Sequence, residues 1–306
     1  MTDRIKYMPA GSISRNDWDG WIRNSCNRRI YATSLFLDIF SPRWEALISD
    51  DGRALMPVTR NRKFGIPYVF QPIFVQQLGC FYREYADAVS LPFFIEKLSE
   101  NFRFIDISLN ELNSLDPSVY RVREMDNYLL DLNRGYDLIS GNYNSNTRRN
   151  IMKARRLGTG LIRHHSPSQT VSMFAANSGK LYPGIRRANY ERLLSLLERA
   201  VAEGFADVRA VRAVNGDTIA SACFLRDFDR FIFYFSANTG EGRMQGAMFF
   251  LIDGFIREHA GSGMLLDFSG SVNPKMAGFY SGFGAERKTY QRLRINTLLF
   301  PLNLMK

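Results

Sequence analysis

Short apolar runs alternate along this chain with amphipathic segments, and turn residues separate them. An aromatic and β-branched run at 231–236 predicts a strand, and a glycine-bearing turn at 238–246 follows it. Residues 247–259 are apolar on nearly every face, which is typical of a helix buried against a sheet. A second strand is predicted at 264–268, before a short helix that carries Tyr280. The region therefore predicts a strand–helix–strand unit with one further helix.

Apolar runs and amphipathic segments also alternate over the rest of the chain. Two hairpins are predicted around the turn sequences Asp50-Asp51-Gly52 and Asn215-Gly216. A helix is predicted over 189–203, with Gly204 in the position of a C-cap. Further elements are predicted as strands at 68–70, 104–108 and 128–132 and a helix at 86–98. Helices and strands mixed throughout favour an α/β or α+β class.

The length of 306 residues suffices for two domains, each with its own core. The strand, turn, helix and strand between residues 68 and 108 repeat the order of the later unit, although unrelated strand–helix–strand units have similar spacing. We expect a degenerate first domain at 1–135 and a second at 136–306. The first copy lacks a comparable glycine-rich turn, so a cofactor is expected in the second half.

The turn before the apolar helix has features of an anion site. Arg243 lies just before the helix, and Gly246 allows a ligand to approach the backbone. A helix N-terminus presents unpaired N–H groups and a positive dipole end, which suit a phosphate or pyrophosphate.

This turn resembles the pyrophosphate loop of the GNAT acyltransferases, Gln/Arg-x-x-Gly-x-Gly/Ala. The chain reads Arg-Met-Gln-Gly-Ala-Met at 243–248, which matches the first two anchors and places Met248 at the last. Asn273, Met276, Tyr280 and Gly284 fall at the intervals of the family's next helix, with Met in place of Ala.

The resemblance implies acetyl-CoA or another acyl-CoA as donor, and no metal. It implies a general acid at Tyr280 that protonates the leaving thiolate, and backbone N–H groups at the end of the first strand that face the thioester. The cofactor-binding residues expected from it are Ser236, Ala237, Asn238, Arg243, Met244, Gln245, Gly246, Ala247 and Asn273.

A second resemblance covers more of the chain. Residues 146–156 are similar to the NTRRNIxKA helix of FemABX-type proteins, and residues 266–271 and 279–284 are similar to their strand and helix signatures. Those proteins carry two GNAT-like halves. The resemblance implies two tandem GNAT-like domains, each a mixed, mostly antiparallel sheet flanked by helices.

Charge narrows the choice of partners. Lys and Arg number 40 against 30 Asp and Glu, so the net charge of +10 favours anionic partners such as coenzyme A, a tRNA acceptor stem, an anionic lipid precursor or an anionic glycan. The densest basic cluster lies at 148–156, where Arg148 and Arg149 are candidates for substrate binding. Tyr182, beside Arg186 and Arg187, is a further candidate. A solvated basic helix face is the alternative interpretation.

Acyl transfer to an amine needs a base, and often an acid for the leaving group. Tyr280 is the candidate acid, unless it only packs on the core. Asp267, in the second strand, is a candidate base or acceptor-binding group, unless its carboxylate only orients a neighbouring loop.

The sequence lacks the residue patterns that a metal site or a disulfide framework needs. His164 and His165 have no carboxylate or cysteine at metal-ligand spacing, and three isolated cysteines favour buried free thiols over disulfides. The N-terminus shows no signal-peptide pattern and no apolar run is long enough to span a membrane, so we expect a cytoplasmic bacterial protein without integral membrane association.

Three functions stay open. The first is an acyl-CoA-dependent N-acyltransferase acting on a small-molecule or peptide amine. The second is a FemABX-like aminoacyltransferase that uses aminoacyl-tRNA in peptidoglycan precursor synthesis. The third is a non-catalytic binding protein with the same fold. None of the three needs DNA as a partner.

Overall fold

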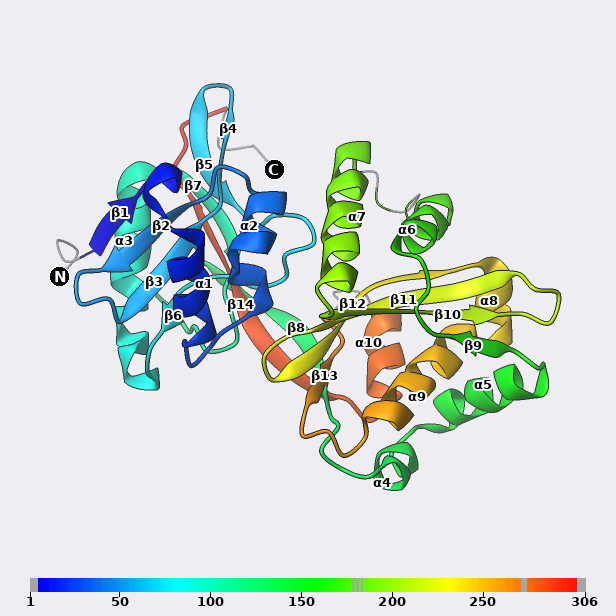
Figure 1. Cartoon of the computed structure of the whole chain (residues 1–306). Coiled ribbons are helices and arrows are strands. Elements are labelled where there is room, and N and C mark those ends of the chain that lie inside the picture. The colour runs from blue at the N-terminus through cyan, green and yellow to red at the C-terminus, as the bar shows by residue number, and fades with distance from the viewer. Residues whose placement is uncertain (1–4, 178, 180–181, 183, 271–273, 302–306) are drawn as a thin grey trace. The chain divides into compact units, whose positions relative to one another are not determined.

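The computed structural model describes residues 5–177, 179, 182, 184–270 and 274–301. The chain divides into a first unit, Met1–Met125 with Thr289–Lys306, and a second unit, Asp126–Lys288 (Figure 1). This division differs from the expected one because the last strand, β14 (Glu286–Asn296), pairs with β7 (Phe104–Ser108) of the first unit. Leu293 lies opposite Ile107 in this antiparallel pair, and both are buried. The C-terminal segment therefore completes the first unit.

The first unit contains two sets of strands, in the orders β1-β2-β3-β6 and β4-β5-β7-β14. Strands β5 and β7 pair in parallel, whereas β1 with β2, β2 with β3, β3 with β6, β4 with β5 and β7 with β14 pair antiparallel. Helix α3 contributes Phe94, Ile95 and Leu98 to a core that contains residues of both sets. The remaining elements of this unit are β1 (Ile5–Met8), α1 (Arg15–Arg23), α2 (Ser34–Phe40), β2 (Glu45–Ser49), β3 (Ala54–Val58), β4 (Arg60–Lys63), β5 (Ile66–Phe70), β6 (Phe81–Tyr82), α3 (Leu91–Asn101) and short 3-10 turns at Ala10–Ser12, Ile30–Ala32 and Tyr85–Ser90.

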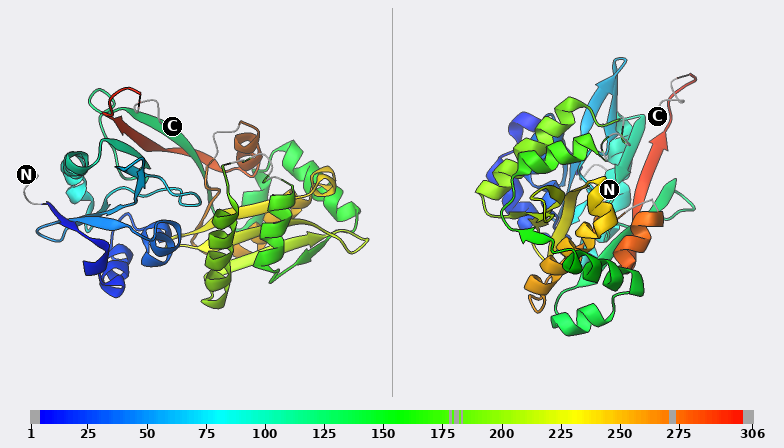
Figure 2. Two further views of the ribbon diagram at one scale, coloured as in Figure 1. Left: turned by 90° about the horizontal axis from the view of Figure 1, so that it is seen from above. Right: turned by 90° about the vertical axis from the view of Figure 1, so that its right-hand side faces the viewer.

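The second unit has strands in the order β8-β13-β12-β11-β10-β9, with β12 and β13 parallel. Helices α6 and α7 lie on one face of this sheet, and α5, α9 and α10 lie on the other (Figure 1). Seen from above, the two green helices α6 and α7 lie over the yellow strands (Figure 2). The elements are β8 (Val122–Asp131), α4 (Tyr136–Gly141), α5 (Ser145–Arg156), β9 (Gly160–Ile162), α6 (Pro167–Ala176), α7 (Arg187–Ala202), β10 (Ala206–Arg212), β11 (Thr218–Arg226), β12 (Arg230–Asn238), α8 (Gly240–Gln245), α9 (Ala247–His259), β13 (Leu265–Asp267) and α10 (Pro274–Ser281).

Helix α9 has the bounds predicted from its apolar pattern, and it is buried against the sheet. Phe255 stacks on Phe224 of β11, with ring centroids 3.7 Å apart. Asp253 and Arg257, about one turn apart in α9, both contact Tyr136 of α4. Asp253 accepts hydrogen bonds from the Tyr136 hydroxyl (2.7 Å) and the Arg155 guanidinium (2.7 Å), and Arg257 lies 3.8 Å above the Tyr136 ring.

The described residues of each unit include a parallel strand pair whose two strands are joined in sequence through a helix. In the first unit α3 lies between β5 and β7 in sequence, with Val69 opposite Ile105. In the second unit α9 lies between β12 and β13, with Ile232 opposite Asp267. The predicted fold class, two tandem units with mixed and mostly antiparallel sheets flanked by helices, is confirmed.

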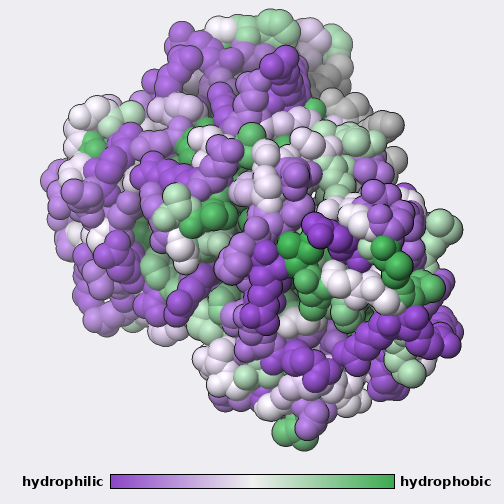
Figure 3. Space-filling model, turned by 45° about the vertical axis from the view of Figure 1, so that its right-hand side comes forward, coloured by the Kyte–Doolittle hydropathy of each residue, from purple (hydrophilic) through white to green (hydrophobic). Residues whose placement is uncertain are grey.

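Hydrophilic side chains cover most of the face seen in Figure 3, and apolar side chains reach it in separate patches. Within the described ranges, no helix combines the length and the apolar character that a membrane crossing requires.

Candidate functional site

The end of β12 separates from its parallel neighbour. Pairing with β13 covers Arg230 to Ile232, whereas β12 continues to Asn238. On the other side, Cys223 of β11 lies opposite Phe235 and Phe224 lies opposite Phe233, so Tyr234 is an extra residue, a β-bulge. The bulge bends β12 close to the point where its pairing with β13 ends. Among the strands of the described residues, 233–238 pair only with β11.

Two consecutive helices follow this strand end. Thr239 caps α8 by accepting a hydrogen bond from the Gly242 backbone N–H (2.9 Å), and the exposed Arg243 donates to the Asn238 backbone carbonyl (2.8 Å). Gly246 joins α8 to α9 in the left-handed conformation, with φ of 74°. A Cβ at Gly246 would lie 2.6 Å from the Asn150 carbonyl oxygen of α5. Close packing against α5 therefore requires glycine here, whether or not a ligand binds.

A cavity of about 350 Å³ lies at this strand end. Four of the predicted cofactor residues share it: Ser236, Asn238, Arg243 and Gly246. The Asn238 side-chain oxygen is buried and accepts no hydrogen bond from the described residues. The rest of the lining is mainly apolar, from Phe233, Gly242, Met248, Phe249, Met276 and Phe279. A mostly apolar cavity with a few polar groups is the usual form of a small-molecule site.

The other predicted cofactor residues lie around this cavity or outside the described residues. Met244 is 67% exposed and does not line the cavity. Gln245 donates to the Glu241 carboxylate (2.7 Å), and Ala237 and Ala247 are buried. Asn273 lies outside the described residues. Their roles stay predictions.

Tyr280 is buried in α10, and its ring stacks on Phe268 at 4.9 Å. Burial raises the pKa of its phenol above the ordinary 10.0, and the nearby Tyr182 hydroxyl and Asp267 carboxylate add to this. The phenol therefore stays protonated at physiological pH. Tyr280 does not line the cavity, but Phe233 and Phe279, which contact its ring, do.

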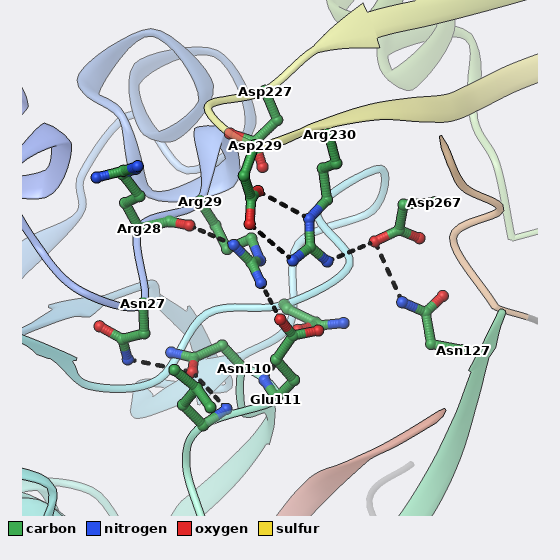
Figure 4. Close-up of polar contacts among 12 residues, drawn as sticks. Asn27, Arg28, Arg29, Asn110, Glu111, Asn127, Asp227, Asp229, Arg230 and Asp267 are labelled. Carbon is green, nitrogen blue, oxygen red and sulfur yellow. Dashed lines mark hydrogen bonds and ion pairs between the residues drawn. The ribbon is translucent and has the colours of Figure 1, made fainter. Parts of the chain in front are cut away.

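Asp267 is buried at the end of β13, where it accepts from three donors. Its carboxylate accepts hydrogen bonds from the Arg230 guanidinium (3.1 Å) and the Asn127 side-chain amide (3.2 Å) (Figure 4). It also accepts one from the Ser269 backbone N–H (2.8 Å). The contact with Ser269 lies at the start of the loop that follows β13, and both interpretations of Asp267 stay predictions. Arg230 and Asn127 were missed in the sequence. The available signal for Arg230 was a charged residue at the start of β12, whose other residues are uncharged.

The predicted substrate residues lie apart from the cavity lining. Arg148 and Arg149 are exposed on α5, where Arg149 donates to Asn146 (3.0 Å). Tyr182 is 53% exposed and stacks on Phe174, with centroids 6.1 Å apart and planes inclined by 16°. Their roles in substrate binding also stay predictions.

Metal-ligating residues do not gather in the part of the chain that the structure describes, where no three His, Cys, Asp or Glu side chains are placed to share an ion. Cys26, Cys80 and Cys223 are free thiols. Burial raises the pKa of Cys80 and of Cys223 well above the ordinary value of 9.0, which suppresses the thiolate form.

No family model and no curated protein matches this chain in sequence. Solved structures do match its fold. The crystal structure of FemX has a TM-score of 0.66 at 11% identity and covers 94% of this chain and 96% of its own. A conserved protein of unknown function from Bacteroides thetaiotaomicron has a TM-score of 0.61 at 9% identity, covering 92% and 96%. L-PGS from Bacillus licheniformis has a TM-score of 0.54 at 12% identity, covering 95% of both chains.

At sequence identities this low, the similarity concerns the backbone fold and carries no information on substrates. The agreement extends over nearly the whole length of this chain and of these three structures. The chain adopts a GNAT-like fold of the FemABX type.

Proposed function

We propose that this protein is an N-acyltransferase that moves an acyl group from an acyl-CoA thioester to an amine of a small molecule or peptide. One observation carries the proposal: four residues predicted to bind the donor line a single cavity at the place where β12 leaves β13. A cavity beside an unpaired strand end suits a donor that has an extended, amide-bearing arm, because such an arm pairs with a strand edge as an added strand does.

The polar groups of the site fit the donor's diphosphate. Arg243 is exposed at the cavity, and the 13-residue helix α9 begins beside it with no side-chain cap. A cation and a helix N-terminus both favour an anion. Met248 lines the cavity where the family has a small residue, so it narrows the site, although a methionine side chain adapts its shape readily.

In the proposed reaction the acceptor amine attacks the thioester carbonyl. A carbon–nitrogen bond forms and the carbon–sulfur bond breaks. The proton that the amine loses is taken up by the leaving thiolate, so coenzyme A departs as the free thiol. Tyr280 donates a hydrogen bond to the leaving sulfur, because its phenol stays protonated. Asp267 is retained as the candidate base, although its three donors favour a positioning role.

Aminoacyl-tRNA is the second candidate donor. The exposed basic residues of α5 support it, because Asn150 of the same helix packs against Gly246 beside the cavity. Arg148, Arg149, Lys153 and Arg156 are all exposed. A basic helix face beside a donor site fits a nucleic acid backbone.

Calorimetric titration of acetyl-CoA and coenzyme A into the full chain tests the proposal. We expect binding with a dissociation constant of about 10 μM. Arg243→Glu replaces the cation with an anion and should weaken binding at least tenfold. Met244→Glu is the matched control, since Met244 neighbours Arg243 and lies outside the lining. Gly246→Glu is unsuitable as a control, because its Cβ would collide with Asn150.

Absence of binding at millimolar concentrations would exclude acyl-CoA as the donor. Transfer from charged tRNA that ribonuclease abolishes would then establish the second candidate. Binding of neither donor would indicate a non-catalytic protein that keeps the fold.

A further inference from the structure

The hairpin of β4 and β5 in the first unit carries an exposed aromatic tip. Arg60 lies opposite Val69 and Lys63 lies opposite Ile66, so Phe64 and Gly65 form the turn. All four residues of β4 are exposed. Phe64 is 78% exposed with φ of 51°, and the Lys63 ammonium lies 5.6 Å from the centre of its ring. Packing within the unit does not account for this phenyl ring.

A second exposed apolar segment leaves the sheet at the same end. Val69 of β5 lies opposite Ile105 of β7, and Asn296 of β14 lies opposite Phe104. The start of β5 and the end of β14 therefore meet the same end of β7, so the hairpin turn and residues 297–300 project together (Figures 1 and 2). Leu299 is 73% exposed and Phe300 is 79% exposed. Three strand spacings separate β4 from β14, about 14 Å.

Positively charged residues lie along the hairpin that carries Phe64, and Arg103 lies beside Thr297 of the second segment. Arg43, Arg60 and Arg62 line a cavity of about 220 Å³ with Asn61 and Pro67 of the hairpin. Arg60 pairs with Glu45 (3.2 Å), whereas the exposed Arg43, Arg62 and Arg103 make no ion pair with any described residue.

Acidic residues are scarce in the same segments. The sequence has no Asp or Glu between Asp51 and Glu84, and none after Glu286. Asp106, on the neighbouring strand β7, is paired with Arg292 (2.6 Å). Glu100, three residues before Arg103, is paired with Lys97 (2.7 Å). The positive charges of Arg62 and Lys63 therefore have no acidic residue beside them in the sequence. We call Arg62, Lys63, Phe64, Arg103, Leu299 and Phe300 the hairpin face.

We propose that the hairpin face docks on an anionic lipid bilayer, with its three apolar side chains in the headgroup region and its cations against lipid phosphates. Proteins anchor at a membrane interface through exposed aromatic and aliphatic side chains that insert there, with adjacent Lys and Arg that bind anionic lipids. A single-stranded nucleic acid would instead need rings arranged along a groove for successive bases to stack on. The hairpin face presents separate projecting tips. The arginine cavity offers a place for a lipid phosphate.

Co-sedimentation of the full chain with phosphatidylcholine vesicles, with and without phosphatidylglycerol, tests the proposal. We expect binding only to vesicles that contain phosphatidylglycerol, and we expect it to weaken as salt is raised. Arg62→Glu with Lys63→Glu should weaken binding at least about 25-fold, roughly fivefold for each positive charge lost. Phe64→Ser should weaken it about tenfold.

Matched controls lie in the second unit. Arg187→Glu with Arg192→Glu on α7 makes the same change in net charge, and Val214→Ser removes an apolar side chain that is 77% exposed. Both should bind vesicles as the unmodified protein does. In a second measurement, the fluorescence of Phe64→Trp should shift to shorter wavelength on anionic vesicles, and that of Val214→Trp should not.

Several results would overturn the proposal. One is the absence of binding to anionic vesicles at low salt, and another is an equal loss of binding in the control variants. Calorimetry with inorganic phosphate and anisotropy with a labelled RNA identify the other occupants. Binding of phosphate or RNA that Arg62→Glu with Lys63→Glu abolishes, without vesicle binding, would assign the face to a free anion or to nucleic acid.

Discussion

Arg230 and Asp267 form a buried ion pair, with Nη1 and Oδ2 3.1 Å apart and side chains that are 3% and 4% exposed. The pair joins β12 to β13 near the point where the two strands separate. It therefore fixes the geometry at the base of the proposed donor site, although neither residue lines the cavity.

Removing one partner of this pair should destabilise the fold. Arg230→Met leaves the Asp267 carboxylate buried without its cation, so we expect the free energy of unfolding to fall by about 3–5 kcal/mol. Urea denaturation measures this. Arg226→Met, at an exposed position of the neighbouring strand, should cost less than about 0.5 kcal/mol. The double variant Arg230→Met with Asp267→Leu should recover part of the loss. A loss below about 1 kcal/mol for Arg230→Met alone would contradict this account.

Tyr280→Phe separates catalysis from packing. The ring stays in its aromatic cluster, so we expect stability to change by less than about 1 kcal/mol. Acyl transfer should fall about 100-fold because the donor to the leaving group is lost, while acyl-CoA affinity stays the same. Tyr128→Phe, whose ring lies 5.9 Å from that of Tyr280, is the matched control and should retain activity. Unchanged turnover in Tyr280→Phe would show that this tyrosine only packs.

Gly246 should tolerate substitution less well than another glycine with the same backbone conformation. Gly246→Ala combines a strained φ of 74° with a Cβ 2.6 Å from the Asn150 carbonyl. Gly261 has φ of 80°, but a Cβ there meets nothing within 4 Å. We expect Gly261→Ala to cost about 1–2 kcal/mol from the backbone alone, and Gly246→Ala about 1–3 kcal/mol more. Equal midpoints of thermal unfolding for the two variants would refute the packing role of Gly246.

The stability of the fold should decrease in mild acid. The His259 ring contacts the rings of Phe231 and Phe255. Burial, together with the charges of Arg209 and Arg226, lowers its pKa below 6.5, and the smaller effects of Glu258 and Asp207 oppose this. The unfolded chain therefore takes up a proton that the folded chain resists. The associated stability is complete above pH 6.5 and is lost as the pH falls below that value.

Replacing His259 should reduce this dependence. We expect His259→Phe to lose less thermal stability than the unmodified protein between pH 7 and pH 5. Part of the loss should remain, because burial and Arg212 also lower the pKa of His165. A steeper loss in His259→Phe would contradict this assignment.

Much of the fold could be predicted because its local patterns are strong. The predicted strand at 104–108 and helix at 247–259 coincide with β7 and α9. Gly204, predicted as a C-cap, has the left-handed φ of 77° that follows a helix end. Strand β14 was missed because its sequence, Glu-Arg-Lys-Thr-Tyr-Gln-Arg-Leu-Arg-Ile-Asn, is rich in charge. Its apolar residues Tyr290 and Leu293 are buried, while Arg292 pairs with Asp106 of the neighbouring strand.

The site could be predicted only in part, because cavities depend on contacts between distant segments. Ser236, Asn238, Arg243 and Gly246 follow one another along the chain, so a local motif located them. The contacts of Asp267 with Arg230 and Asn127 join separate strands and have no local pattern.

The pairing of β14 with β7 has a consequence for the order in which the units form during synthesis. Residues 126–288 are contiguous, so every strand of the second unit is available before the last segment is translated. The first unit lacks one strand of its sheet until residues 289–306 have left the ribosome. Until then β7 has an open edge that other nascent chains can pair with. The first unit is thus completed after the second, although most of its residues are synthesised before it.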